Sequence, residues 1–164
     1  MRARVAYVAL AAALLSLGAA PGSSLSESKA GAPAGPPSEL LVIVHPAVRV
    51  ASLSAADLES IFSGSRRRWP DGGAIVAFNY PAGDGVRVLF DRVVLRLDPD
   101  AVARYWIDQR IRGMGRPPRQ VPSAALLPRL IARLAGSVGY VAAAAAPPGT
   151  KLVARIRRGK VVAP

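Results

Sequence analysis

The residues best placed to do chemistry lie in the segment PAGDGVR, residues 81–87. This segment follows the apolar run AIVAFNY and precedes an amphipathic stretch, which indicates a strand leading through glycines into a helix. At such a junction free backbone N–H groups and the helix dipole point to the same place, where an anion can bind. The N–H groups of Gly85 and Val86, with the Arg87 guanidinium as counter-charge, would then hold a small oxyanion.

Asp84 stands where that anion would lie, and it allows two interpretations. As a helix N-cap, its carboxylate accepts the N–H groups of the first helical turn and fills the anion position itself. As a ligand-binding residue, it accepts a hydrogen bond from a protonated ligand, since a carboxylate repels a fully charged anion. Arg87 is either a ligand residue or a solvated side chain. Tyr80 either offers its hydroxyl to a ligand or packs its ring over the sheet edge.

The composition argues against catalysis and against metal binding. The chain has no cysteine and a single histidine, His45, so it lacks a set of zinc ligands. No G-x-S-x-G motif occurs, and no nucleophile, base and oxyanion hole can be assembled from the sequence. We therefore expect a protein that is not an enzyme and that holds no cofactor.

The formal net charge of +12 favours anionic partners, among them small oxyanions and anionic components of the cell envelope. No basic run is interleaved with aromatic residues, so nucleic acid is not an expected partner. The triplet Arg66–Arg68 before Trp69 suggests either a solvated helix end or a phosphate or membrane patch. The arginines of 155–158 would discourage edge-to-edge pairing of a strand.

The beginning of the chain resembles an export signal. Arg2 and Arg4 precede an apolar run and then small residues, the order typical of a cleaved signal peptide over residues 1–22. A retained anchor is the alternative. Residues 23–38 have almost no large apolar side chains and are expected to form a flexible leader. One folded domain then spans 39–164, in a protein that is periplasmic or secreted.

The folded part alternates strand and helix patterns, which predicts an α/β layer sandwich with a mixed, largely parallel sheet flanked by helices. The expected strands span 40–44, 74–79, 138–141, 152–156 and 160–162. The expected helices span 52–62, with Ser54 placed to cap it, 86–97, 101–112 and 122–134.

Four segments together resemble the phosphate-type substrate-binding proteins of ABC transporters, in particular a short branch of that family. They are SLSAADLESIFSGSRRRWPDGG (52–73), AIVAFNYPAGDGVRVLF (74–90), YWIDQRIRGMGRPPRQV (105–121) and AGSVGYV (135–141). The resemblance implies a periplasmic-binding-protein fold, reduced here to about one lobe. It also implies an anion-binding loop at 81–87, where the family carries an Arg and a Ser-Gly-Thr step. This sequence has Tyr80, Asp84 and Val86 at those three places.

The resemblance, together with the positions at which the sequence departs from the family pattern, leaves two possible functions. The first is an exported solute-binding protein that holds phosphate or another small oxyanion at the 81–87 loop and works with ABC transporter membrane subunits. Ser54, Asn79 and Tyr140 would supply neighbouring polar contacts, by analogy of position. The alternative is an envelope interaction or structural protein that keeps the scaffold without ligand binding and contacts another envelope protein.

Overall fold

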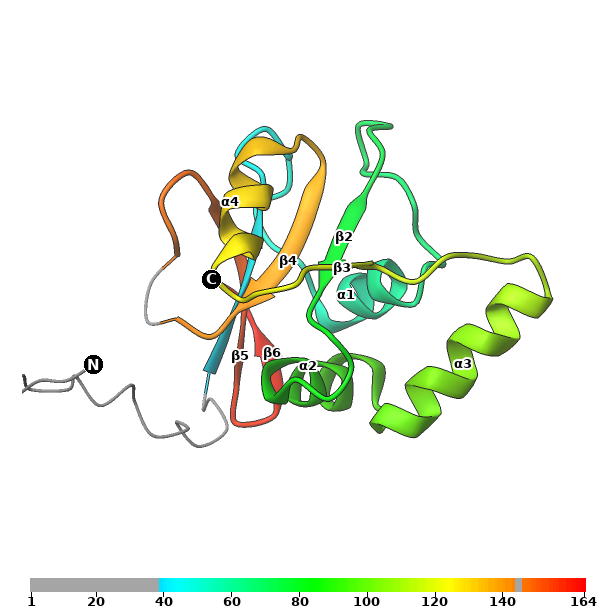
Figure 1. Ribbon diagram of the computed structural model, residues 1–164. Helices are drawn as coiled ribbons and strands as arrows, with labels where there is room; N and C mark the ends of the chain where they lie inside the picture. The colour runs from blue at the N-terminus through cyan, green and yellow to red at the C-terminus, as the bar shows by residue number, and fades with distance from the viewer. Residues whose placement is uncertain (1–38, 144–145) are drawn as a thin grey trace, which may run out of the picture. The chain divides into compact units, whose positions relative to one another are not determined.

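The computed structural model describes residues 39–143 and 146–164, in which strands and helices alternate along the chain (Figure 1). The expected signal peptide and leader, 1–22 and 23–38, lie outside the described residues. The strands are β1 (Glu39–Val44), β2 (Val76–Asn79), β3 (Arg119–Gln120), β4 (Ser137–Val141), β5 (Lys151–Arg157) and β6 (Lys160–Val162). The helices are α1 (Ala55–Phe62), α2 (Gly85–Phe90), α3 (Pro99–Ile111) and α4 (Leu126–Arg133), with a π-helical turn, η1 (Asp91–Leu95), directly after α2.

All the described strands belong to one six-stranded sheet in the order β3-β2-β4-β1-β5-β6. β2 runs parallel to both of its neighbours, β3 and β4. β1 lies antiparallel between β4 and β5, and β6 completes the sheet as an antiparallel edge strand. The expected mixed sheet is therefore confirmed, although its parallel pairings are confined to β2 and are fewer than expected.

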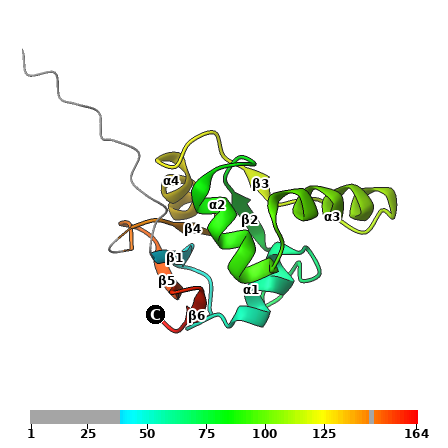
Figure 2. The same cartoon turned by 90° about the horizontal axis from the view of Figure 1, so that it is seen from below.

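Helices cover both faces of the sheet, as Figures 1 and 2 show. Gly139 of β4 faces α4, because a Cβ at this position would lie 2.8 Å from Ile131 Cδ1 and 3.0 Å from Leu127 Cδ2. The next residue, Tyr140, points to the opposite face, where its ring stacks on Phe90 of α2. β1 is fully apolar and buried at Leu40–Val44, as expected for a strand with helices on both sides.

An aromatic cluster joins the sheet to α1 and α2. The rings of Phe90 and Tyr140 stack with centroids 3.8 Å apart, and Phe62 meets Phe90 edge-on at 4.6 Å. Tyr80, just beyond β2, meets Tyr140 edge-on at 5.5 Å. All four rings are buried, so the cluster fixes the start of the 81–87 segment against the core.

The largest differences from the expected elements concern two helices. The helix expected over 86–97 is divided into α2 and η1, and the helix expected over 122–134 begins only at Leu126. β3 was not expected at all, because its two residues are exposed and carry no apolar pattern. In the described part of the chain, no helix has the length and the hydropathy that crossing a membrane requires.

Candidate functional site

The 81–87 segment leaves β2 and enters α2 as the sequence predicts. Gly83 has a φ of +87°, a conformation that glycine adopts without strain, and the turn is closed by a hydrogen bond from Asp84 N–H to Pro81 O. Asp84 is the N-cap of α2: its Oδ1 accepts hydrogen bonds from the N–H groups of Val86, at 2.8 Å, and Arg87, at 3.4 Å. The carboxylate therefore occupies the Val86 N–H, one of the two backbone donors predicted to hold an oxyanion, together with the Arg87 N–H.

Arg87 is buried and its guanidinium is used within the chain. Its side chain is 10% exposed, its Nε donates to Asp91 Oδ2 at 3.2 Å, and its Nη1 donates to Tyr80 O at 2.9 Å. It is therefore not the solvated side chain that was one of its two predicted roles. Instead it connects α2, η1 and the end of β2.

Asp91, the partner of Arg87, was not singled out from the sequence, although the i, i+4 spacing of the two residues was visible there. Its side chain is 5% exposed, and within the described residues its Oδ1 has no hydrogen-bond partner. Burial raises the pKa of the Asp91 carboxyl, and the neighbouring Arg87 charge only partly opposes this effect.

Tyr80 and Tyr140 are core residues beside the loop. The Tyr140 hydroxyl donates to Asn79 Oδ1, the same oxygen that accepts the Tyr80 backbone N–H, at 2.9 Å. Burial, together with the nearby Asp84 charge, raises the pKa of the Tyr80 phenol to about 12. Burial also raises the pKa of the Tyr140 phenol well above its usual value. Tyr80 packs its ring in the core, which was one of its two predicted roles.

Ser54 has a different place in the structure. It caps α1: its Oγ accepts a hydrogen bond from Asp57 N–H at 3.2 Å, and the Asp57 carboxylate accepts one from Ser54 N–H at 3.0 Å. Within residues 39–143 and 146–164, no hydrogen bond joins Ser54 to the 81–87 loop. Of the residues predicted to bind ligand, Tyr80, Asp84, Gly85, Val86, Arg87 and Tyr140 lie together, and Ser54 belongs to a separate capping box.

The capping box gives a direct test. We expect Ser54→Ala to lower the free energy of unfolding at neutral pH by about 1 kcal/mol, because the Asp57 N–H loses its acceptor and the Asp57 carboxylate loses the donor hydroxyl. The hydrogen bond from the Ser54 hydroxyl is the main cause that lowers the pKa of Asp57. A lowered folded-state pKa stabilises the fold above the ordinary carboxyl pKa and less so at lower pH. Urea unfolding should therefore show a cost that shrinks as the pH falls through the folded pKa of Asp57.

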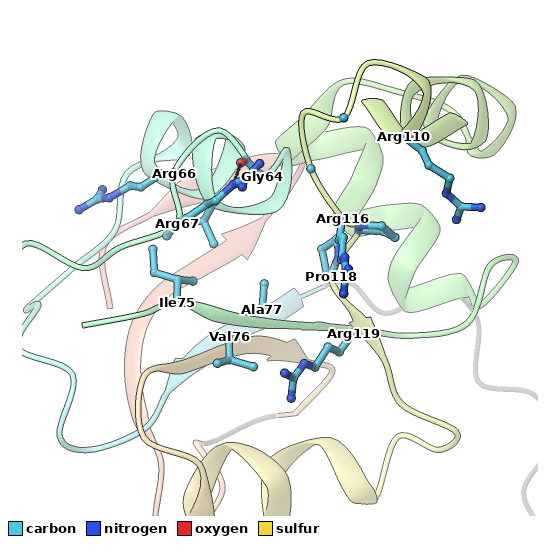
Figure 3. Close-up of a pocket in the computed structure, with 14 residues that line it drawn as sticks. Gly64, Arg66, Arg67, Ile75, Val76, Ala77, Arg110, Arg116, Pro118 and Arg119 are labelled. Carbon is cyan, nitrogen blue, oxygen red and sulfur yellow. Dashed lines mark hydrogen bonds between the residues drawn. The ribbon is translucent and has the colours of Figure 1, made fainter. Parts of the chain in front are cut away.

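A second feature was not expected from the sequence: a cleft of about 910 Å³ beside the edge of β2. Five arginines line it, and no acidic residue is among its lining residues in the described chain. Figure 3 shows the cleft with Ile75, Val76 and Ala77 beside it. We call it the arginine cleft; its arginines are Arg66, Arg67, Arg110, Arg116 and Arg119.

The arginines of the cleft differ in how they are held. Arg66 forms an ion pair with Asp57 at 2.8 Å, and Arg67 donates to the carbonyl oxygens of Gly64 and Met114. Among the described residues, no ion pair includes the other three, Arg110, Arg116 and Arg119. Arg66 and Arg67 belong to the triplet seen in the sequence, whereas the other three are distant along the chain and form no motif.

Two further observations on the described residues concern possible binding sites. In the described residues, no three His, Cys, Asp or Glu side chains are grouped closely enough to hold a metal ion. A smaller cavity of about 210 Å³ lies beside Arg87 and Asp91, between α2, α3 and the chain near Pro117.

Comparison with known proteins identifies the fold. The chain is similar to an ABC-type phosphate transport receptor from Vibrio cholerae, with a TM-score of 0.55, 18% identity, and coverage of 70% of this chain and 44% of the receptor. It is also similar to a protein from Clostridium perfringens described as a phosphate ABC transporter substrate-binding protein, with bound phosphate. For that protein the TM-score is 0.55, the identity is 15%, and the match covers 70% of this chain and 43% of the other.

A protein from Planctomyces limnophilus, described as phosphate binding, gives a TM-score of 0.52 at 17% identity, over 72% of this chain and 42% of that protein. No protein-family model and no curated protein matches the sequence. The described residues thus have the fold of phosphate-type substrate-binding proteins, as the sequence resemblance implied. The chain spans less than half the length of these solved structures.

Proposed function

We propose that this protein is an exported binding module that keeps the fold of phosphate-type receptors and acts by contacting another component of the cell envelope. The observation that carries the proposal is the state of the 81–87 loop. The N–H groups of Val86 and Arg87 are bound to Asp84, and the Arg87 guanidinium is bound to Asp91 and to Tyr80 O. A loop held in this way presents a free oxyanion with a carboxylate and with fewer ready donors than the sequence predicts.

The second candidate function is capture of phosphate or a similar oxyanion at the same loop, as in a receptor that works with ABC transporter subunits. It is favoured by the likeness to phosphate receptors and by the open space beside Gly83 and Gly85, where an added Cβ would meet no atom within 4 Å. For this function Asp84 would have to turn away from Val86 and Arg87 or accept a proton from the ligand.

Isothermal titration of phosphate into the phosphate-free protein, with sulfate as a parallel ligand, separates the two candidates. We expect no saturable heat from either anion, because Asp84 binds the Val86 and Arg87 N–H groups and repels negative charge. Saturable binding of phosphate would establish the receptor function and refute the interaction proposal.

An Asp84→Ser variant tests whether the carboxylate is what fills the loop. Serine still caps α2, so we expect the variant to fold and to gain weak phosphate binding, with a Kd of roughly 1 mM. The matched control is Asp98→Ser, the same change at the N-cap of α3, where Asp98 accepts the Ala101 N–H at 2.7 Å. Equal phosphate binding by both variants would show that Asp84 has no special effect on the loop.

A further inference from the structure

The arginine cleft carries more positive charge than the ion pairs of the described residues offset. Three of its arginines, Arg110, Arg116 and Arg119, are exposed and line the cleft. Within the described residues none of the three forms an ion pair. Positive charges that line one cleft repel one another, and among the described residues only one of the five arginines, Arg66, has a carboxylate partner, Asp57. A partner that brings negative charge would remove the repulsion and gain charge-assisted hydrogen bonds.

The cleft is also lined by apolar side chains, and these restrict the kinds of partner that can fit it. Side chains of Ile61, Ile75 and Val76 line it, together with Pro117 and Pro118. A highly charged polymer without apolar groups would leave these side chains without contacts. A peptide segment in which carboxylates flank an apolar side chain matches both the arginines and the apolar surface.

Exposed apolar side chains next to the cleft favour a protein as the partner. Ile107 and Ile111, one turn apart on α3, are 59% and 79% exposed, and Met114, in the segment that follows α3, is 59% exposed. Arg110 and Gly113, from the same stretch of chain, line the cleft. In Figures 1 and 2, α3 extends away from the sheet. Apolar residues gathered near a charged cleft are typical of a protein-binding surface.

We propose that the arginine cleft binds an acidic segment of a partner protein, with carboxylates on its arginines and an apolar side chain against Ile75 and Val76. This inference rests on the proposed function, because it names the surface and the chemistry of the contact. Arg116 and Arg119 are the main carboxylate-binding residues, since they lie three residues apart at and just before β3, line the cleft and are exposed.

The test uses a fluorescein-labelled peptide in which glutamates flank two central leucines, and its binding is followed by fluorescence anisotropy. We expect saturable binding that weakens as salt is added. A peptide with glutamine in place of every glutamate, and one with serine in place of both leucines, should each bind at least about tenfold more weakly. Equal binding of all three peptides would overturn the proposal.

Matched charge-reversal variants test whether the peptide binds in the arginine cleft. Arg116→Glu with Arg119→Glu should weaken peptide binding by about tenfold or more. The control, Arg158→Glu with Lys160→Glu, makes the same change of charge at exposed positions of the β5–β6 turn, at the other edge of the sheet. We expect the control to lose less than about threefold, the effect of net charge alone. Equal losses in the two variants would show attraction to the whole protein and would refute a site in the cleft.

A photo-reactive group at the central apolar position of the peptide gives a measurement on the unaltered protein. Crosslinks should map to residues 61–77 and 110–119, and crosslinks elsewhere would refute the site.

The phosphate titration decides the proposed function separately. If the wild-type protein binds neither phosphate nor the peptide, the inference fails and the interaction proposal stands. If it binds phosphate saturably, the interaction proposal fails.

Discussion

Replacing Arg87 by methionine is expected to lower the free energy of unfolding by about 3–5 kcal/mol. The substitution leaves the Asp91 carboxylate buried, with its Oδ1 already unpartnered in the described chain and its Oδ2 deprived of the Arg87 Nε. It also removes the donor to Tyr80 O that connects α2 to the end of β2. Urea unfolding at neutral pH, followed by circular dichroism, measures the loss.

Arg112→Met is the matched control for this effect. Arg112 and Asp108 form an ion pair with the same i, i+4 spacing, at 2.9 Å, but their side chains are 63% and 49% exposed. Exposed pairs of this kind contribute roughly 0.3–0.5 kcal/mol. If Arg87→Met costs no more than Arg112→Met, the buried pair does not hold the loop in place. The double variant Arg87→Met with Asp91→Leu should recover most of the stability, since replacing both partners removes both buried charges.

The loss caused by Arg87→Met should also depend on pH. The pKa of Asp91 is raised in the folded protein, so the folded state binds this proton more tightly than the unfolded state does. Stability from this group is therefore present at low pH and is lost as the pH rises through the folded pKa. Without Arg87 the pKa rises further, and we expect the deficit relative to the wild type to grow from acidic to neutral pH.

Replacing Gly136 by alanine is expected to cost about 3 kcal/mol or more. Gly136 has a φ of +77°, and a Cβ there would lie 2.3 Å from Ala74 O, a backbone atom that cannot turn aside. The Gly136 carbonyl accepts hydrogen bonds from Val76 N–H at 3.0 Å and from Trp69 Nε1 at 2.9 Å. Moving this turn would therefore disturb the start of the β2–β4 pairing and the buried Trp69.

Gly72→Ala separates the two causes of the loss at Gly136, which are the left-handed backbone conformation and the contact of the added Cβ with Ala74 O. Gly72 has a φ of +87°, and an added Cβ would meet no atom within 4 Å, so only the left-handed conformation is penalised, by about 1–2 kcal/mol. Thermal or urea unfolding of both variants should show the larger loss at Gly136. Equal losses would show that the contact with Ala74 O relaxes without cost.

The sequence predicted the elements that carry strong local signals. Ser54 and Asp57 lie at capping-box spacing and form that box, and the apolar run at Leu40–Val44 is a buried strand. β3 could not be predicted, because two exposed residues become a strand only through pairing with Phe78 and Asn79. The division of the helix after Phe90 likewise left no mark in the apolar pattern.

The candidate sites show a similar limit. Asp84 as an N-cap follows from local sequence, because a cap is satisfied within three residues. Whether the Arg87 side chain points to solvent or into the core depends on how α2 packs against the rest of the chain, and a local pattern does not show this. The arginine cleft depends on chain folding even more, since residues near 66 and near 116 meet only in the folded protein.

The position of β1 in the sheet has a consequence for the order of folding. This strand comes first among the described elements, yet its two neighbours come near the end of the chain: Leu41 pairs with Val141 on one side and with Arg155 on the other. Contacts so distant in sequence close late, after slower loop closure than local helices require. A chain emerging from the ribosome therefore cannot complete the centre of its sheet until β5 has been synthesised. A truncation before Ser137 should leave β1 without either partner and the domain without a stable core.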